Sequence, residues 1–293
     1  MQEMLSPGAR LRAALADGPL LIPGVFNALV ARMAERAGFR AVYQSGAALS
    51  AGLAAVPDVG LLAHTEFAEQ GHYLAQSVGI PVLSDADTGF GEALAVERTV
   101  HLYESAGLAG LHLEDQQLPK RCGHLTGKTL VSTDEMVGKL KAALFARQDR
   151  DFFIIARTDA RSEEGFSAAV DRAQAYLEAG ADMIFPESLE TPDEFARFAD
   201  EIEIPLLANM TEFGRSPLLT LEELGAMGYA AVLCPVTMFR VAMQSVEDAL
   251  RQLADERTQR GFLDAMQTRE RLYDLLNYDD VNERDRGYFG GPS

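Results

Sequence analysis

Short apolar runs alternate along the chain with longer segments in which apolar residues recur at helical spacing. The short runs are continuously apolar, as expected of parallel strands that are buried on both faces. We predict strands at residues 21–25, 41–44, 81–84, 110–113, 152–156, 183–185, 205–208 and 231–233. Helices are predicted between them at residues 28–37, 93–106, 134–146, 166–179, 191–200 and 221–227. Eight such units without a long linker predict one (β/α)8 barrel, and a doubly wound open sheet is the alternative.

Polar residues stand where these predicted strands end. Barrel active sites form at the carboxyl ends of the strands, so these residues are candidate site residues. In chain order they are Asn27, Ser45 with Gly46, Asp85 with Asp87, Glu114 with Asp115, Arg157 with Asp159, Glu187, Asn209 with Thr211, and Pro235. Some of them have the side chains of helix N-caps, which is the structural alternative for Asn27, Ser45, Asp87 and Thr211.

Two aspartates two residues apart end the third predicted strand. In extended backbone, Asp85 and Asp87 point the same way, and their charges repel unless a cation or a proton lies between them. Glu114 ends the next strand and can add a ligand. A site of oxygen ligands suits Mg²⁺, for which Mn²⁺ could substitute. The alternative is a pair of solvated loop aspartates.

A dense basic run, Lys120-Arg121-Cys122-Gly123-His124, follows the fourth predicted strand. Neighbouring positive charge lowers the pKa of a cysteine, so Cys122 could transfer a proton near neutral pH. It could instead be a covalent nucleophile paired with His124, or an incidental thiol in a solvated loop. Cys234 follows an apolar strand and is expected to be a packed core thiol.

Charge and composition narrow the class of protein. The chain of 293 residues carries 44 acidic against 26 basic side chains, a net charge of −18, which disfavours nucleic acid as a partner. Two cysteines cannot form a disulfide framework, and no signal peptide or membrane helix is recognisable. We therefore expect a soluble cytoplasmic protein, with residues 1–293 as one barrel domain and a helical extension at about 240–285.

The combination of motifs resembles the isocitrate lyase/phosphoenolpyruvate mutase superfamily over nearly the whole chain. The resemblance rests on the basic run together with residues 84–91 (SDADTGFG), 43–46 (YQSG), 156–160 (ARTDA), 185–187 (FPE), 209–214 (NMTEFG) and 266–269 (MQTR). It implies cleavage of 2-methylisocitrate to pyruvate and succinate, the last step of the methylcitrate route of propionate catabolism. It also implies Mg²⁺ and a homotetramer with C-terminal helices exchanged between subunits.

The resemblance assigns roles by position. Asp85, Asp87 and Glu114 match or adjoin the metal-site acids, and residues 45–47 match a loop that holds the pyruvate carboxylate by backbone N–H groups. The matching substrate-contacting positions are Ser45, Gly46, Ala47, Cys122, Gly123, Arg157, Glu187, Asn209, Met210, Thr211, Arg240 and Arg269. Two residues depart from the family pattern: Ala47, which keeps its N–H, and Gln44, which puts fine substrate preference in doubt.

Cleavage of this kind requires a base, stabilising cations and an acid. Tyr43 is the candidate base, and Cys122 the acid that protonates carbon. The candidate cations for the departing fragment are Arg157, His124 and Lys120. Specificity for a methyl-bearing substrate is assigned to Phe185, Leu233 and Pro235. The rivals are a sibling enzyme, such as an isocitrate or dimethylmalate lyase, an oxaloacetate decarboxylase or a phosphonate-processing enzyme, and a non-enzymatic metabolite-binding barrel.

Overall fold

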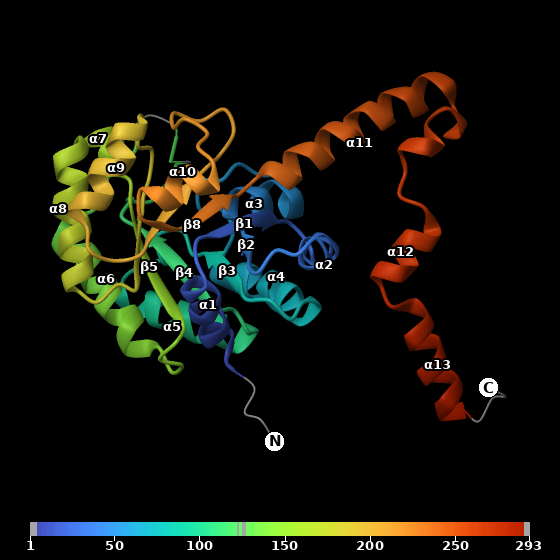
Figure 1. The fold of residues 1–293 in the computed structure, drawn as a ribbon, viewed down its shortest axis with the longest axis horizontal. Helices are drawn as coiled ribbons and strands as arrows, with labels where there is room; N and C mark the ends of the chain where they lie inside the picture. Colours follow the sequence, from blue (N-terminus) through green and yellow to red (C-terminus); the bar gives the residue numbers. More distant parts are fainter. Residues whose placement is uncertain (1–4, 122, 125–126, 290–293) are drawn as a thin grey trace. The chain divides into compact units, whose positions relative to one another are not determined.

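The computed structural model describes residues 5–121, 123–124 and 127–289. Within them the strands are parallel and form a closed barrel in sequence order, as Figure 1 shows. The strands are β1 (Leu20–Val25), β2 (Val42–Gln44), β3 (Val82–Asp85), β4 (Gly110–Glu114), β5 (Phe153–Thr158), β6 (Met183–Pro186), β7 (Leu206–Asn209) and β8 (Tyr229–Cys234). Pairing of β1 with β8 closes the barrel. The predicted (β/α)8 barrel is confirmed and the open sheet is excluded.

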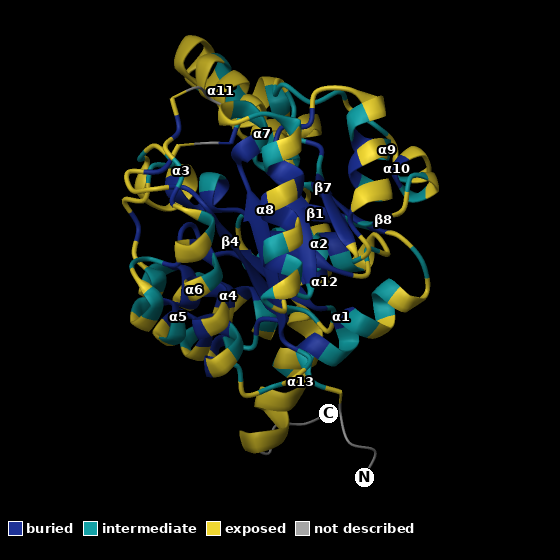
Figure 2. Ribbon diagram, turned by 90° about the vertical axis from the view of Figure 1, so that its left-hand side faces the viewer, coloured by how far each residue is buried: buried dark blue, intermediate teal, exposed yellow. Residues whose placement is uncertain are grey.

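Helices follow the strands and surround them. They are α1 (Pro7–Ala16), α2 (Ala28–Arg36), α3 (Gly46–Ala54), α4 (His64–Ser77), α5 (Ala93–Ala106), α6 (Thr133–Ala146), α7 (Ala160–Glu163), α8 (Phe166–Glu178), α9 (Pro192–Glu201) and α10 (Leu221–Ala226). Figure 2 shows the buried strands inside this ring of helices, whose outer faces are exposed. No helix in the described ranges is long and apolar enough to cross a membrane. The cytoplasmic location stays a prediction.

Two apolar clusters hold the barrel together. Successive side chains of a strand point to opposite faces, so Tyr43 lies inside the barrel and Val42 packs toward the helices. The interior cluster includes Ile22, Phe185 and Leu233, and Leu11 of α1 joins it. The barrel is therefore a packed core rather than a pore, and the room for a ligand is at its end.

The chain divides into two compact units, residues 1–239 and 240–293, and each is described by itself. The second unit comprises most of α11 (Thr237–Glu256), a 3-10 turn (Arg260–Ala265), α12 (Arg269–Leu275) and α13 (Tyr278–Phe289). Large apolar side chains are exposed along α11, at Val241, Met243, Val246, Leu250 and Leu253. The expectation of one domain with a helical extension stays a prediction.

Candidate active site

The polar residues that end the strands lie at one end of the barrel, because parallel strands have their carboxyl ends together. Each of seven residues either ends a strand or stands directly before or after the last residue of one: Ser45, Asp85, Glu114, Arg157, Glu187, Asn209 and Pro235. Asn27 and Ser45 are also the N-caps of α2 and α3. Within the described residues, neither Asp87 nor Thr211 caps a helix, so the capping alternative is wrong for these two.

The aspartates of β3 adopt a different geometry from the one expected. The strand ends at Asp85, and Asp87 has a left-handed φ of 46°, so the two residues do not share an extended segment. Asp85 instead accepts the backbone N–H of Asp87 at 2.9 Å and that of Gly46 at 3.2 Å. A turn, rather than strand periodicity, brings both carboxylates to the barrel mouth.

Lys120 lies among these acids. Its Nζ is 2.6 Å from an oxygen of Asp87 and 2.6 Å from one of Asp58, and its side chain is 2% exposed. Burial lowers the pKa of Lys120, but the carboxylates of Glu114, Asp87, Asp85 and Asp58 outweigh burial and hold its pKa well above the ordinary value. Lys120 is therefore charged in the site. Asp58 is a member of this cluster that the sequence analysis did not find.

Two of the buried carboxyl groups in this cluster, those of Asp87 and Glu114, have raised pKa values. Burial, reinforced by Asp85 and Asp58 and opposed by Lys120, raises the pKa of Asp87 to about 7. Burial also raises the pKa of Glu114 well above its usual range, although Arg157 and Lys120 oppose it. Both Glu114 oxygens are buried without a hydrogen-bond partner. One of them lies 3.3 Å from Arg157, but a buried carboxylate that accepts no hydrogen bond is costly, so a further cation or proton donor would stabilise it.

The carboxylate oxygens of Asp85, Asp87 and Glu114 are ligands of the kind that Mg²⁺ prefers. In the described part of the chain, no group of three or more histidine, cysteine, aspartate or glutamate side chains is arranged to hold a metal ion. Mg²⁺ does not require one, because it keeps several waters and is usually bound through one or two carboxylates. Asp85, Asp87 and Glu114 supply oxygen donors at the barrel mouth, and neither oxygen of Glu114 has a hydrogen-bond partner.

Gly123 and His124 of the basic run pack against residues at or after the ends of β5, β6 and β7. Cys122 lies outside the described residues, but Gly123 and His124 are described. A Cβ at Gly123 would overlap the Arg157 guanidinium and the Glu187 side chain, so this glycine backbone packs directly on both. His124 Nε2 lies 2.7 Å from a Glu187 oxygen, and its Nδ1 accepts the N–H of Arg215 at 2.9 Å. The ring proton is therefore on Nε2, facing Glu187.

Arg157 is held by acids on three neighbouring strands. Its Nε and Nη2 donate to Asp159 at 3.0 and 3.1 Å, and Nη1 is 3.3 Å from Glu114. Burial would raise the pKa of Glu187, but Arg157 and His124 outweigh burial and lower it. Asn209 also donates to Glu187, at 3.1 Å. Arg157 is thus a fixed, buried cation at the barrel mouth, and its guanidinium lies over the Phe185 ring at 5.1 Å.

The segment expected to be a carboxylate-binding loop is the first turn of α3. Ser45 is the N-cap, and its hydroxyl accepts the N–H of Ala48 at 3.4 Å. The first N–H groups of a helix have no partner within the helix, and they favour anions. Gly46 gives its N–H to Asp85, and a Cβ there would contact the Asp85 carboxylate. Ala47 follows it in the same turn.

Tyr43 faces a histidine that the sequence analysis missed. Its hydroxyl lies 2.7 Å from Nε2 of His112, inside the barrel. Burial, and then Asp85, raise the pKa of Tyr43 well above 10, and burial lowers the pKa of His112 to about 4 despite the opposing effect of Asp85. Both are therefore neutral in this site. His112 precedes Glu114 by two residues on β4, so strand periodicity could have identified it.

The remaining residues predicted to contact substrate or set specificity lie in different parts of the molecule. Phe185 and Leu233 belong to the barrel interior, and Pro235 follows β8. Met210 is buried, and its sulfur accepts the N–H of Leu219 at 3.2 Å, so this side chain has a packing contact. Thr211, next to it, is partly exposed. Arg240 and Arg269 lie in the second unit, so their predicted contacts with substrate are not tested.

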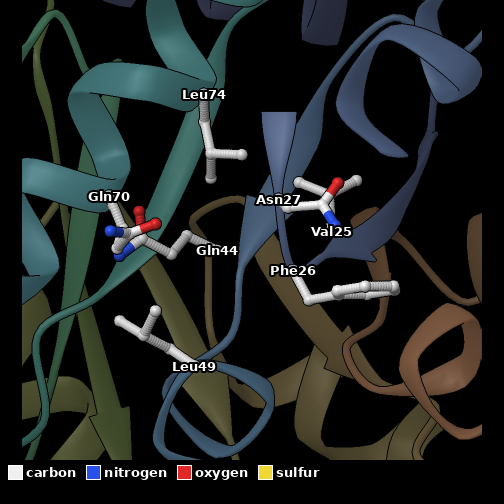
Figure 3. A pocket seen from close by; sticks show the side chains of 7 residues that line it. All are labelled: Val25, Phe26, Asn27, Gln44, Leu49, Gln70 and Leu74. Atoms are coloured by element: carbon white, nitrogen blue, oxygen red, sulfur yellow. The ribbon is translucent and has the colours of Figure 1, made fainter. Parts of the chain in front are cut away.

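Gln44 does not line the barrel mouth. Its amide Nε2 donates to the Phe67 carbonyl of α4 at 2.9 Å. Its side chain lines a small cavity between β2 and the helices, shown in Figure 3 with Val25, Phe26, Asn27, Leu49, Gln70 and Leu74. The side chain of Gln44 faces the helical layer, whereas that of Tyr43 faces the barrel interior. Gln44 therefore gives no reason to doubt the substrate preference.

A closed parallel barrel with buried acids and the buried cations Lys120 and Arg157 at its mouth is the architecture of a barrel enzyme. The sequence matches the phosphoenolpyruvate phosphomutase family over residues 11–254, and the chain belongs to that family, within the isocitrate lyase/phosphoenolpyruvate mutase superfamily. It is a carbon–carbon lyase.

Two relatives indicate its place within the family. The chain is 50% identical over 280 residues to a 2-methylisocitrate lyase from Aeropyrum pernix, covering 95% of this chain and 90% of the relative. It is 42% identical over 288 residues to a 2,3-dimethylmalate lyase from Eubacterium barkeri, covering 98% of this chain and 100% of the relative.

Solved structures agree with the fold. An oxaloacetate acetylhydrolase in complex with 3,3-difluorooxalacetate has a TM-score of 0.92 at 34% identity and covers 98% of both chains. A phosphonopyruvate hydrolase in complex with oxalate and Mg²⁺ has a TM-score of 0.88 at 33% identity, covering 97% of this chain and 100% of that one.

Proposed function

We propose that this protein cleaves 2-methylisocitrate to pyruvate and succinate. The observation that carries the proposal is the barrel mouth, where the unpartnered oxygens of Glu114 lie beside the buried cation Arg157. The relative from Aeropyrum pernix, named a 2-methylisocitrate lyase, supports this substrate. The reaction would be the last step of the methylcitrate route of propionate catabolism.

We propose that Asp85, Asp87 and Glu114 hold Mg²⁺, directly or through water, with Mn²⁺ as a substitute. When bound, the ion would lower the pKa of a coordinated hydroxyl and neutralise carboxylate charge. The oxygen donor set and the raised pKa values of Asp87 and Glu114 support this assignment. So does the phosphonopyruvate hydrolase structure, which was determined with oxalate and Mg²⁺.

The chain's own residues would divide the remaining chemistry. Loss of the hydroxyl proton and cleavage of the carbon–carbon bond give the carbonyl of pyruvate, and the bonding electrons stay on the succinate fragment. Arg157, with His124 and Lys120, would stabilise the negative charge of that fragment. Cys122 would then protonate its carbon. The N–H groups at the start of α3, at Ser45, Gly46 and Ala47, would hold the pyruvate carboxylate, and the Gly46 N–H would then have to leave Asp85, to which it donates here.

Tyr43 is proposed as the base. Its hydroxyl lies inside the barrel beside His112, with Asp85 nearby. Because burial and Asp85 raise its pKa, Tyr43 is a neutral phenol in the site described here. It can accept the substrate proton only when a nearby positive charge lowers that pKa.

The substrate panel that tests the function comprises 2-methylisocitrate, isocitrate, 2,3-dimethylmalate and oxaloacetate, each with Mg²⁺. We expect pyruvate and succinate from 2-methylisocitrate at the highest kcat/KM. The interior side chains Phe185 and Leu233, with Pro235, are proposed to leave room for its methyl group, which is worth about 1–3 kcal/mol in a pocket of this kind. A higher kcat/KM with 2,3-dimethylmalate would reject the proposal and favour the activity of the Eubacterium barkeri relative.

Removing the metal is expected to abolish turnover, and Mg²⁺ or Mn²⁺ should restore it. Asp87→Asn should raise the Mg²⁺ concentration needed for half-maximal activity by at least about tenfold, because one anionic ligand is lost. The measurement is activity against free Mg²⁺ after chelation. Asp193→Asn, on α9, is the control and should leave this concentration unchanged. Full activity in the chelated enzyme would rule out the metal.

We also propose a homotetramer that exchanges its C-terminal helices. The exposed apolar side chains of α11 support this, because a helix with such a face normally packs against another surface.

A further inference from the structure

The backbone next to Cys122 is held by two side chains from outside the basic run. The Gly123 carbonyl accepts a hydrogen bond from Lys128 Nζ and another, at 2.9 Å, from the Ser188 hydroxyl. Ser188 follows β6, so one of these bonds ties the segment to the barrel. The Lys128 side chain is completely buried, which is rare for a lysine and requires compensating partners.

Asp159 supplies that compensation. One of its oxygens is 2.9 Å from Lys128 Nζ and accepts from Arg157 Nη2 at 3.1 Å, and the other accepts from Arg157 Nε at 3.0 Å. A single buried carboxylate therefore joins the cation beside the Gly123 carbonyl to the cation proposed to bind substrate.

The backbone of Asp159 is in turn held by a second buried carboxylate, that of Asp115. Its backbone N–H donates to Asp115 at 2.8 Å, and Asp115 also accepts from Thr158 and Tyr176, each at 2.8 Å. Asp115 is completely buried, so this support is rigid. A continuous series of hydrogen bonds therefore runs from Tyr176 on α8, through Asp115, Asp159 and Lys128, to the Gly123 carbonyl.

From this geometry we propose that Lys128 is a positioning residue, which, with Asp159, fixes the Gly123 carbonyl, next to Cys122 in the sequence, in register with Arg157. The inference rests on the proposed function, because it takes Cys122 as the acid and Arg157 as the cation for the departing fragment. Lys128 touches neither substrate nor a reacting atom. Its contribution is that the Gly123 backbone keeps one fixed separation from Arg157, since a displacement of about 1 Å can reduce a rate by roughly 10²-fold.

Lys128→Met tests the proposal, because methionine has a similar length but cannot donate a hydrogen bond. We expect kcat on 2-methylisocitrate to fall about 10²-fold. A second readout needs no turnover: the rate at which iodoacetamide alkylates Cys122, followed by peptide mass spectrometry. This rate should rise roughly tenfold, because losing a hydrogen bond to a charged group favours local opening by at least that factor. Cys234 in the same chain is the internal reference.

Two further variants separate positioning from general stability. Lys139→Met removes another buried lysine, which donates at 3.4 Å to the Thr88 carbonyl and does not touch the segment. It should leave kcat and Cys122 alkylation unchanged. Ser188→Ala removes the other bond to the Gly123 carbonyl and should change both readouts in the same direction as Lys128→Met, by less. It also keeps the test open if Lys128→Met does not fold.

The outcomes distinguish the two proposals. Unchanged Cys122 alkylation in both Lys128→Met and Ser188→Ala would overturn the positioning role, whatever the substrate. If wild-type protein does not cleave 2-methylisocitrate but both variants still expose Cys122, the proposed function is wrong and the anchoring by Lys128 stands.

Discussion

Cys122→Ser is expected to abolish turnover of 2-methylisocitrate while the protein still binds it. A serine hydroxyl is a far weaker acid than a cysteine thiol, so it cannot deliver a proton to carbon at a useful rate. Positioned proton transfer is worth about 10²–10⁴ in rate, and kcat should fall within or beyond that range. The measurements are steady-state kinetics and calorimetric titration of the variant with substrate and Mg²⁺.

Cys234→Ser is the matched control. Cys234 ends β8, and burial, followed by Glu212, raises the pKa of its thiol, so it is a neutral group. Its replacement should leave kcat close to that of the wild type. Turnover of Cys122→Ser at the wild-type rate would remove Cys122 as the acid, and loss of substrate binding in that variant would assign it a binding role instead.

The barrel was predictable because strands buried on both faces have a continuously apolar sequence. All eight predicted strands were found, with ends within one or two residues. The helices α1, α3, α4 and α7 were not predicted. The residues of α3, Gly46–Ala54, are almost all small and apolar, so no polar face marks a helix. Their burial comes from partners distant in sequence, which a local pattern does not reveal.

Sequence reasoning could predict only those candidate site residues that stand at the ends of strands. Asp85, Glu114, Arg157 and Glu187 stand at strand ends, and parallel closure brings them together. Lys128 and Asp58 lie between elements, and their roles depend on contacts with Asp159 and Lys120. The local geometry of Asp87 also escaped sequence reasoning, because a left-handed turn replaced the extended backbone that strand periodicity assumes.

Arg157→Lys and Arg157→Met together test the buried cation. Lysine retains the charge but cannot form the two-pronged contact with Asp159 while also facing Glu114. We expect Arg157→Lys to lower kcat about 10²–10³-fold, the usual effect of removing one donor that stabilises developing negative charge. Arg157→Met leaves three acids without their shared cation, so it should also lower the free energy of unfolding by about 3–5 kcal/mol.

Arg161 provides the comparison, because it pairs with Glu190 and Glu194 at 2.8–3.0 Å rather than with the acids around Arg157. Arg161→Met should cost stability and leave kcat and KM unchanged. If Arg157→Lys lost stability without losing kcat, Arg157 would serve only to neutralise Asp159 and Glu187. If instead kcat fell while the unfolding midpoint stayed near that of the wild type, the loss would arise in the reaction itself, since lysine still neutralises the acids around it.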